Sequence, residues 1–184
     1  MDNTSTYEEK EMIETIDNII PKSHQDQLLN TVTDLAFDWH YMEDVTYVAA
    51  DERGQNTPGF ANLLVNGTQR SGKEPLFMAP LNEYLYRTNQ KLLTLHRMRL
   101  GCLLNNSDLE HNNKHVDYNF PHQVALYYLN TSDGDTLVWD GDIITRVTPQ
   151  KGRFFVFDGS MPHASSCPKE HSTRIVLTYN FTTQ

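Results

Sequence analysis

Cysteine is scarce in this sequence: Cys102 and Cys167 are the two cysteines among 184 residues. Small secreted domains that depend on disulfides are much richer in cysteine. We therefore expect both residues to be small, buried, apolar groups in a protein of a reducing compartment. A chain of this length can bury a proper core, so we interpret residues 1–184 as a single domain.

Long apolar runs are also missing. The longest ones fall far short of the roughly 20 residues that a membrane-spanning helix needs. After Met1 the chain continues with the polar and acidic stretch DNTSTYEEKE, which lacks the apolar core of a secretory signal. These features predict a cytoplasmic protein with no membrane partner.

Positive charge is in deficit, with 15 lysines and arginines against 24 acidic residues and a formal net charge of −9. Nucleic-acid binding depends on a clustered cationic face, so we expect no nucleic acid as a partner. A local patch of Arg87, Lys91, Arg97 and Arg99 is the alternative, although such charges also occur often at the ends of helices and strands.

The first half of the sequence predicts two helices and a long loop. Ser23 is a candidate cap for a first helix, whose apolar residues recur at helical spacing: Leu28, Leu29, Val32, Leu35 and Ala36. A second amphipathic helix is indicated by Phe77, Leu81, Tyr84, Leu85 and Leu92. Residues 51–75 are rich in glycine and proline, and a loop of that length is either disordered or a functional lid. We interpret residues 1–94 as mainly helical support with a lid loop at 51–75.

From Leu95 onward the sequence predicts short strands. The segments LHRMRLGCLL, HQVALYYL, DTLVW, DIITRV, GRFFVF and TRIVLTYNF are rich in β-branched and aromatic residues. Asp140-Gly141 is a strong signal for a hairpin between two of them. Evenly spaced strands after helices predict an α+β fold in which residues 95–184 form a β-sandwich or jelly roll (a double-stranded β-helix), with the N-terminal helices packed on one sheet.

The stretch KHVDYNFPHQVALYYLN contains the first candidate ligands. His115 and Asp117 are two residues apart, so in an extended segment their side chains project to the same side. His163 follows a predicted buried strand and completes a set of two histidines and one carboxylate. This is the facial triad of non-haem Fe(II) oxygenases, in which the open coordination positions accept a 2-oxo acid and O₂.

Arg174 is the second indicator. If RIVLTYNF is a strand, Arg174, Val176, Thr178 and Asn180 face one way, and the apolar alternate residues face the helices. Arg174 then points into the barrel, where an unpaired guanidinium is costly. A dicarboxylic acid would satisfy it with a bidentate contact. The alternative is an exposed arginine at a strand end.

Taken in order, the motifs HVD, YYLN with a glycine-containing turn before DTLVW, GRFFVFDGSMPH and RIVLTYNF resemble the 2-oxoglutarate- and Fe(II)-dependent dioxygenases of the prolyl 4-hydroxylase-like group, bacterial and phage forms included. The resemblance covers roughly Leu95 to Phe181. It implies that His115, Asp117 and His163 bind the catalytic iron and that Arg174 binds the distal carboxylate of 2-oxoglutarate. For a phage protein, the compartment is the host cytoplasm.

Two further cosubstrate contacts follow from the resemblance. Tyr128 matches a position that hydrogen-bonds the same carboxylate in some relatives, with a core aromatic as the alternative. Relatives with an R-x-S pattern have serine where Val176 stands, which leaves Thr178 as the candidate second contact.

The resemblance implies an oxidoreductase that uses Fe(II), 2-oxoglutarate and O₂ to hydroxylate a C–H bond. The first candidate substrate is a prolyl residue of a peptide or protein, over which the 51–75 loop folds. The alternatives are a free amino acid or other small metabolite, a non-catalytic metal-binding jelly-roll module, and a cupin-like iron or manganese enzyme that does not use 2-oxoglutarate.

Overall fold

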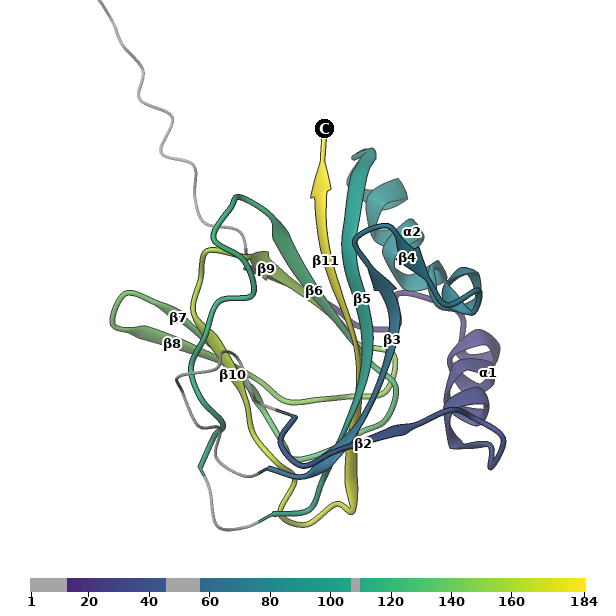
Figure 1. Cartoon of the computed structure of the whole chain (residues 1–184). Coiled ribbons are helices and arrows are strands. Elements are labelled where there is room, and N and C mark those ends of the chain that lie inside the picture. Colours follow the sequence, from purple (N-terminus) through teal and green to yellow (C-terminus); the bar gives the residue numbers. More distant parts are fainter. Residues whose placement is uncertain (1–12, 46–56, 107–109) are drawn as a thin grey trace, which may run out of the picture.

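The computed structural model describes residues 13–45, 57–106 and 110–184 (Figure 1). The elements, in chain order, are β1 (Ile13–Ile16), α1 (Lys22–Thr33), β2 (His40–Met42), β3 (Gly59–Asn66), β4 (Gln69–Arg70), the 3₁₀ helix η1 (Glu74–Phe77), α2 (Ala79–Arg87), β5 (Leu92–Leu104), β6 (Gln123–Tyr128), β7 (Thr136–Asp140), β8 (Ile143–Val147), β9 (Phe154–Asp158), β10 (His163–Ser165) and β11 (Thr173–Thr183).

The strands form two antiparallel sheets. The larger has eight strands in the order β1-β9-β6-β11-β5-β3-β2, with β4 paired to β3, and the smaller has the order β10-β7-β8. Figure 1 shows the sheets facing each other, with α1 and α2 on the outer side of the larger sheet. The predicted α+β jelly roll is confirmed. No helix in the described ranges is long and apolar enough to cross a membrane.

The larger sheet buries both of its faces. Ile175, Leu177, Tyr179 and Phe181 of β11 join the core between that sheet and the helices. Val176 belongs to the second core, between the two sheets. Arg174 is on the same inward side and is 3% exposed. The alternation predicted for β11 is therefore confirmed, and with it the inward direction of Arg174.

The helical support is smaller than predicted. Helix α1 begins after Pro21, which has no side-chain capping bond, so Ser23 is the second helical residue and its predicted capping role is wrong. The Pro21 carbonyl accepts the first backbone bonds of the helix, from the N–H groups of His24 and Gln25 at 2.9 and 3.0 Å. The helix ends at Thr33, which leaves Leu35 fully exposed.

The predicted lid loop is wrong where the structure describes it. Residues 59–66 form β3, which is hydrogen-bonded between β5 and β2. Gly59 is required by close packing, because a Cβ there would lie 2.6 Å from the carbonyl oxygen of Cys102. The glycine that suggested a loop therefore marks a close approach of two strands. Residues 51–56 lie outside the described residues.

Other predictions in the second half are confirmed. β7 and β8 form the expected hairpin, with its two-residue turn at Gly141–Asp142, one position later than the Asp-Gly pair. Gly141 has a φ of 55°, which glycine adopts without strain. Cys102 and Cys167 are buried free thiols.

Candidate metal and cosubstrate site

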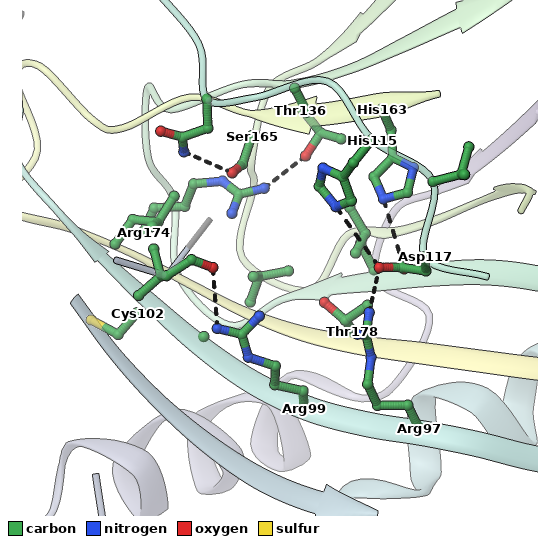
Figure 2. A pocket seen from close by; sticks show the side chains of 18 residues that line it. Arg97, Arg99, Cys102, His115, Asp117, Thr136, His163, Ser165, Arg174 and Thr178 are labelled. Carbon is green, nitrogen blue, oxygen red and sulfur yellow. Dashed lines mark hydrogen bonds and ion pairs between the residues drawn. The ribbon is translucent and has the colours of Figure 1, made fainter. Parts of the chain in front are cut away.

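Three side chains from two segments of the chain converge between the sheets. His163 begins β10, and His115 precedes β6 and forms an isolated antiparallel bridge with His163. The backbone bonds of that bridge are 3.0 Å and 2.8 Å long. One ligand atom each from His115, Asp117 and His163 lies within 4.8 Å of the others. The structure thus brings together the triad predicted from sequence (Figure 2).

Both histidines are oriented for metal binding through Nε2. Their Nδ1 atoms lie 3.0 Å and 3.2 Å from the carbonyl oxygens of Asn113 and Met161. A carbonyl oxygen can only accept, so these contacts favour the neutral tautomer with the proton on Nδ1 and the lone pair on Nε2. The Nε2 atoms of His115 and His163 lie 3.8 Å and 3.7 Å from carboxylate oxygens of Asp117.

Asp117 is held by two neighbours. Arg97 contacts its Oδ1 at 2.5 Å, and Asn180 donates to its Oδ2 at 2.7 Å. Asn180 in turn accepts a bond of 2.9 Å from Arg97, so the three side chains form a closed network. Burial raises the pKa of Asp117, but Arg97, His163 and Asn180 together hold that pKa well below its usual range. Asp117 is therefore a carboxylate at neutral pH.

Burial lowers the pKa of His163 to about 4, although the Asp117 charge opposes this. His163 is therefore neutral at pH 7, as a metal ligand must be. Two imidazoles and one carboxylate on one face are the donor set of non-haem iron(II) oxygenases, so these residues fit Fe(II).

Arg174 lies at another part of the same cavity. Its Nε donates to the carbonyl of Gly134 at 2.8 Å, and its Nη2 donates to the Thr136 hydroxyl at 2.7 Å. No carboxylate pairs with it within the described part of the chain. The cavity of about 210 Å³ therefore contains a buried cation with unused donors.

The two secondary cosubstrate candidates occupy different positions. Tyr128 is fully buried, and its hydroxyl donates to Thr136 at 2.7 Å. The guanidinium of Arg174 lies over its ring, 5.6 Å from the centroid. Thr178 lines the cavity wall together with Val176. Their contacts to a cosubstrate remain predictions.

Sequence reasoning missed several residues of this site. Thr136 is contacted by both Tyr128 and Arg174, and Asn180 and Arg97 hold Asp117. Arg97 and Arg99 line the cavity, so the predicted surface patch is wrong for both of them. The alternation of residues in RMRLGCLL indicates the inward direction of both arginines. Met98 and Leu100 pack on the outer face of the sheet, so the alternate residues Arg97 and Arg99 face the cavity.

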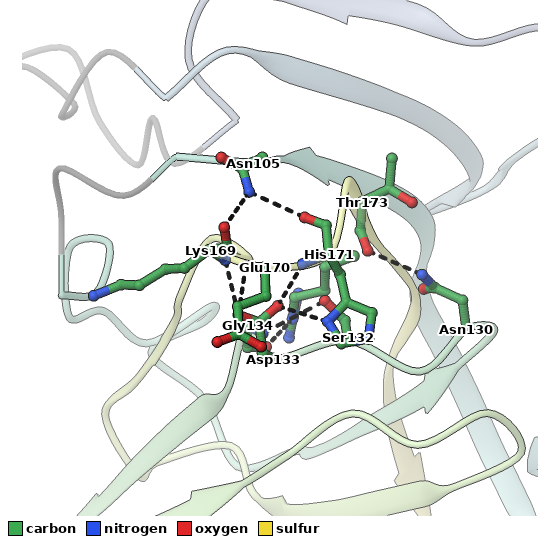
Figure 3. A network of polar contacts seen from close by, with 10 residues as sticks. Asn105, Asn130, Ser132, Asp133, Gly134, Lys169, Glu170, His171 and Thr173 are labelled. Carbon is green, nitrogen blue, oxygen red and sulfur yellow. Dashed lines mark hydrogen bonds and ion pairs between the residues drawn. The ribbon is translucent and has the colours of Figure 1, made fainter.

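A polar network fixes the segment that leads into β11 (Figure 3). The carboxylate of Asp133 accepts from the backbone N–H groups of Lys169, Glu170 and His171 at 2.9, 2.8 and 3.1 Å. Asn130 bonds to both sides of Arg174, donating to the Thr173 carbonyl and accepting from the Ile175 N–H. The network thereby determines where β11 begins and where Arg174 stands.

Gly134 belongs to the same turn and supplies a carbonyl acceptor for Arg174. A Cβ at this position would lie 2.6 Å from the Ser166 carbonyl oxygen and 2.9 Å from the Pro168 nitrogen. Glycine is needed here because two backbone segments pass so close to each other.

No family model matches the chain, and the comparison with curated proteins gives no match either. Solved structures do match. A prolyl hydroxylase from Trichoplax adhaerens, in complex with a peptide fragment of the hypoxia inducible factor oxygen degradation domain, is 15% identical with a TM-score of 0.67, covering 92% of this chain and 82% of that chain.

Two further structures match comparably. An oxidoreductase of the 2OG-Fe(II) oxygenase family from Burkholderia pseudomallei is 11% identical with a TM-score of 0.68, covering 92% of this chain and 85% of that chain. HygX from Streptomyces hygroscopicus, with nickel and 2-oxoglutarate bound, is 13% identical with a TM-score of 0.60, and the match covers 92% of this chain and 82% of that chain. The resemblance predicted from the sequence motifs is confirmed for the fold: the chain has the jelly roll shared by prolyl hydroxylases and other 2-oxoglutarate- and iron-dependent oxygenases.

Proposed function

We propose that this protein is an Fe(II)- and 2-oxoglutarate-dependent dioxygenase that hydroxylates a C–H bond. One observation carries the proposal. A facial triad with histidine Nε2 atoms directed at a carboxylate shares a cavity with a buried arginine that has no carboxylate partner among the described residues. A structural metal site alone has no need of that cation, which makes a non-catalytic module the weaker alternative.

Each residue has a distinct role in this proposal. His115, Asp117 and His163 would hold the iron, which supplies the activation of O₂ that is coupled to decarboxylation of 2-oxoglutarate. Arg174 would hold the distal carboxylate of 2-oxoglutarate, with Tyr128 and Thr178 as further contacts. The buried Val176 and Leu126 line the same cavity and exclude water from the reacting atoms.

Two substrate classes are candidates. A prolyl residue is supported by the fold shared with the peptide-bound prolyl hydroxylase. A free amino acid or other small acid is supported by a feature of this cavity itself, the cation at Arg99.

The test is an uncoupled-turnover assay with Fe(II), ascorbate and a panel of prolyl peptides and free amino acids. Purified protein should convert 2-oxoglutarate to succinate slowly alone and faster with a true substrate. At a 2-oxoglutarate concentration near the KM of the wild type, Arg174→Ala should lose most of this turnover, whereas Arg70→Ala, a change at an exposed surface arginine, should keep it. No consumption of 2-oxoglutarate under any condition would favour the cupin-like enzyme or the non-catalytic module instead.

A further inference from the structure

The cavity is cationic in an acidic protein. Three arginines line it, Arg97, Arg99 and Arg174, and the one carboxylate among its described lining residues is Asp117. The whole chain, by contrast, has a net charge of −9. A concave site lined by one sign of charge concentrates ligands of the opposite sign.

Two of the three guanidinium groups have clear roles. Arg97 is paired with Asp117 and Asn180 at 2.5 Å and 2.9 Å. Arg174 has two short protein contacts, to Gly134 and Thr136, and its remaining donors suit the distal carboxylate of 2-oxoglutarate under the proposed function. Neither of these two guanidinium groups is therefore available to bind another ligand.

Arg99 has much weaker partners. Its Nη2 lies 3.5 Å from the sulfur of Met42 and 3.4 Å from the carbonyl oxygen of Val45, both at the long limit of hydrogen bonding. Its Nε and Nη1 have no hydrogen-bond partner within the described ranges, and no carboxylate there pairs with it. Figure 2 shows its guanidinium projecting from β5 into the cavity.

This arrangement is unfavourable without a ligand. Burial lowers the pKa of Arg99, and the neighbouring charge of Arg97 lowers it further. The charge of Asp117 raises this pKa but only partly offsets the decrease. A partly buried guanidinium with such poor contacts lowers the stability of the fold, and an anion that binds to its planar fork offsets this cost. A divalent metal ion at the triad would add to the positive charge of the cavity.

The position of Arg99 separates it from the 2-oxoglutarate clamp. Arg99 pairs with Thr178 across β5 and β11, whereas Arg174 pairs with Leu103. The two positions are thus four residues, or about 13 Å, apart along the strands. Arg174 is anchored on the turn at Gly134, and Arg99 is held against Met42 and Val45.

We propose that the primary substrate carries a carboxylate that pairs with Arg99, and that it is a small organic acid such as a free amino acid. This inference rests on the proposed function. It favours the small-molecule class, because a prolyl residue within a peptide has no carboxylate of its own beside the ring. The planar fork of arginine matches a carboxylate or a phosphate bidentately, so a phosphorylated substrate is the other source of the same chemistry.

The experiment measures binding and not turnover. Protein loaded with Mn(II) and saturating 2-oxoglutarate is titrated by calorimetry with free amino acids, with their carboxamides, with a prolyl peptide blocked at both ends, and with inorganic phosphate. At least one amino acid should bind about 10- to 100-fold more tightly than its carboxamide, because a charge-assisted hydrogen bond contributes a difference in affinity of about this size. Arg99→Gln should reduce this preference to less than about two-fold, and Arg99→Lys should retain part of it. Arg70→Gln, the matched change at an exposed arginine, should retain all of it.

The outcomes separate the two proposals. If 2-oxoglutarate fails to bind the Mn(II)-loaded wild type, the proposed function fails and this inference with it. If 2-oxoglutarate binds but acids and amides bind alike, or the preference survives in Arg99→Gln, the role of Arg99 is overturned and the proposed function stands. If the blocked peptide binds most tightly, or if phosphate binds most tightly and through Arg99, the proposal of a carboxylate substrate is likewise overturned.

Discussion

At the scale of single residues, the site depends on how Asp117 is held. A carboxylate that binds a metal through one oxygen needs its other oxygen fixed, and partners of this kind orient the ligand. Here Arg97 and Asn180 each contact one oxygen and also contact each other. The site is therefore ordered before any metal arrives.

Asn180→Ala tests this arrangement without changing a charge. The substitution removes the bond to Asp117 Oδ2 and frees Arg97 Nε, so affinity for Mn(II) should fall about 10- to 100-fold. Asn62→Ala is the control, because Asn62 is also buried and donates to the backbone carbonyl of Asp38, and neither residue lines the cavity. Competition with a chelating dye measures both affinities. Equal Mn(II) affinity in the two variants would show that Asp117 needs no such support.

Arg174 makes the second residue-scale prediction. Arg174→Ala should raise the apparent KM for 2-oxoglutarate by about 30-fold or more, because losing one partner of a buried charge pair costs about 2–5 kcal/mol. Arg174→Lys should be milder but not neutral, since lysine cannot form the bidentate fork. Steady-state kinetics with varied 2-oxoglutarate measure both effects, and normal KM values in both variants would contradict the role of Arg174.

At the scale of elements, the turn at Asp133 positions the strand that carries Arg174. Its carboxylate accepts three backbone N–H bonds from residues 169–171 and a further bond from the His171 ring. Although burial raises the pKa of Asp133, these bonds hold it well below the usual range. The ionised Asp133 therefore stabilises the folded state fully above the ordinary aspartate pKa of about 3.9. This stabilisation is lost as the pH falls toward the lower pKa that Asp133 has in the folded protein.

Asp133→Asn should therefore change how stability depends on pH. At pH 7 the variant should be less stable by about 1–2 kcal/mol, the worth of a partly exposed set of charge-assisted bonds. As the pH falls from about 5 to about 2, this difference in stability should disappear, because only the wild type has the carboxyl group of Asp133 with its lowered pKa. Urea unfolding at several pH values measures the difference. Parallel stability curves would show that the turn does not depend on the charge.

Strand β3 shows where sequence reasoning failed at this scale. Its segment GFANLLVN follows glycine and proline signals that are typical of loops. Gly59 is a glycine because the Cys102 carbonyl is so close, and that contact is not visible in the local sequence. The strands of the second half were predictable because their apolar residues recur in short runs that turn signals separate.

At the scale of the whole molecule, the grouping of His115, Asp117 and His163 and the direction of Arg174 were predictable, since residue types and strand alternation indicate them. The inward direction of Arg97 and Arg99 was missed although the alternation in RMRLGCLL indicates it, because charged residues usually lie at the protein surface. The result is an acidic protein with a cationic interior cavity, a contrast that appears only once β5 and β11 are paired.

We expect one cavity to bind a divalent metal and 2-oxoglutarate together. Calorimetric titration of 2-oxoglutarate into protein with and without Mn(II) tests it most directly. We predict tight binding only with Mn(II) and loss of Mn(II) binding in His163→Ala. In Arg174→Ala, Mn(II) binding should be retained while 2-oxoglutarate binding becomes much weaker. Joint binding would be contradicted by full Mn(II) occupancy in His163→Ala, or by 2-oxoglutarate binding that depends on neither Mn(II) nor Arg174.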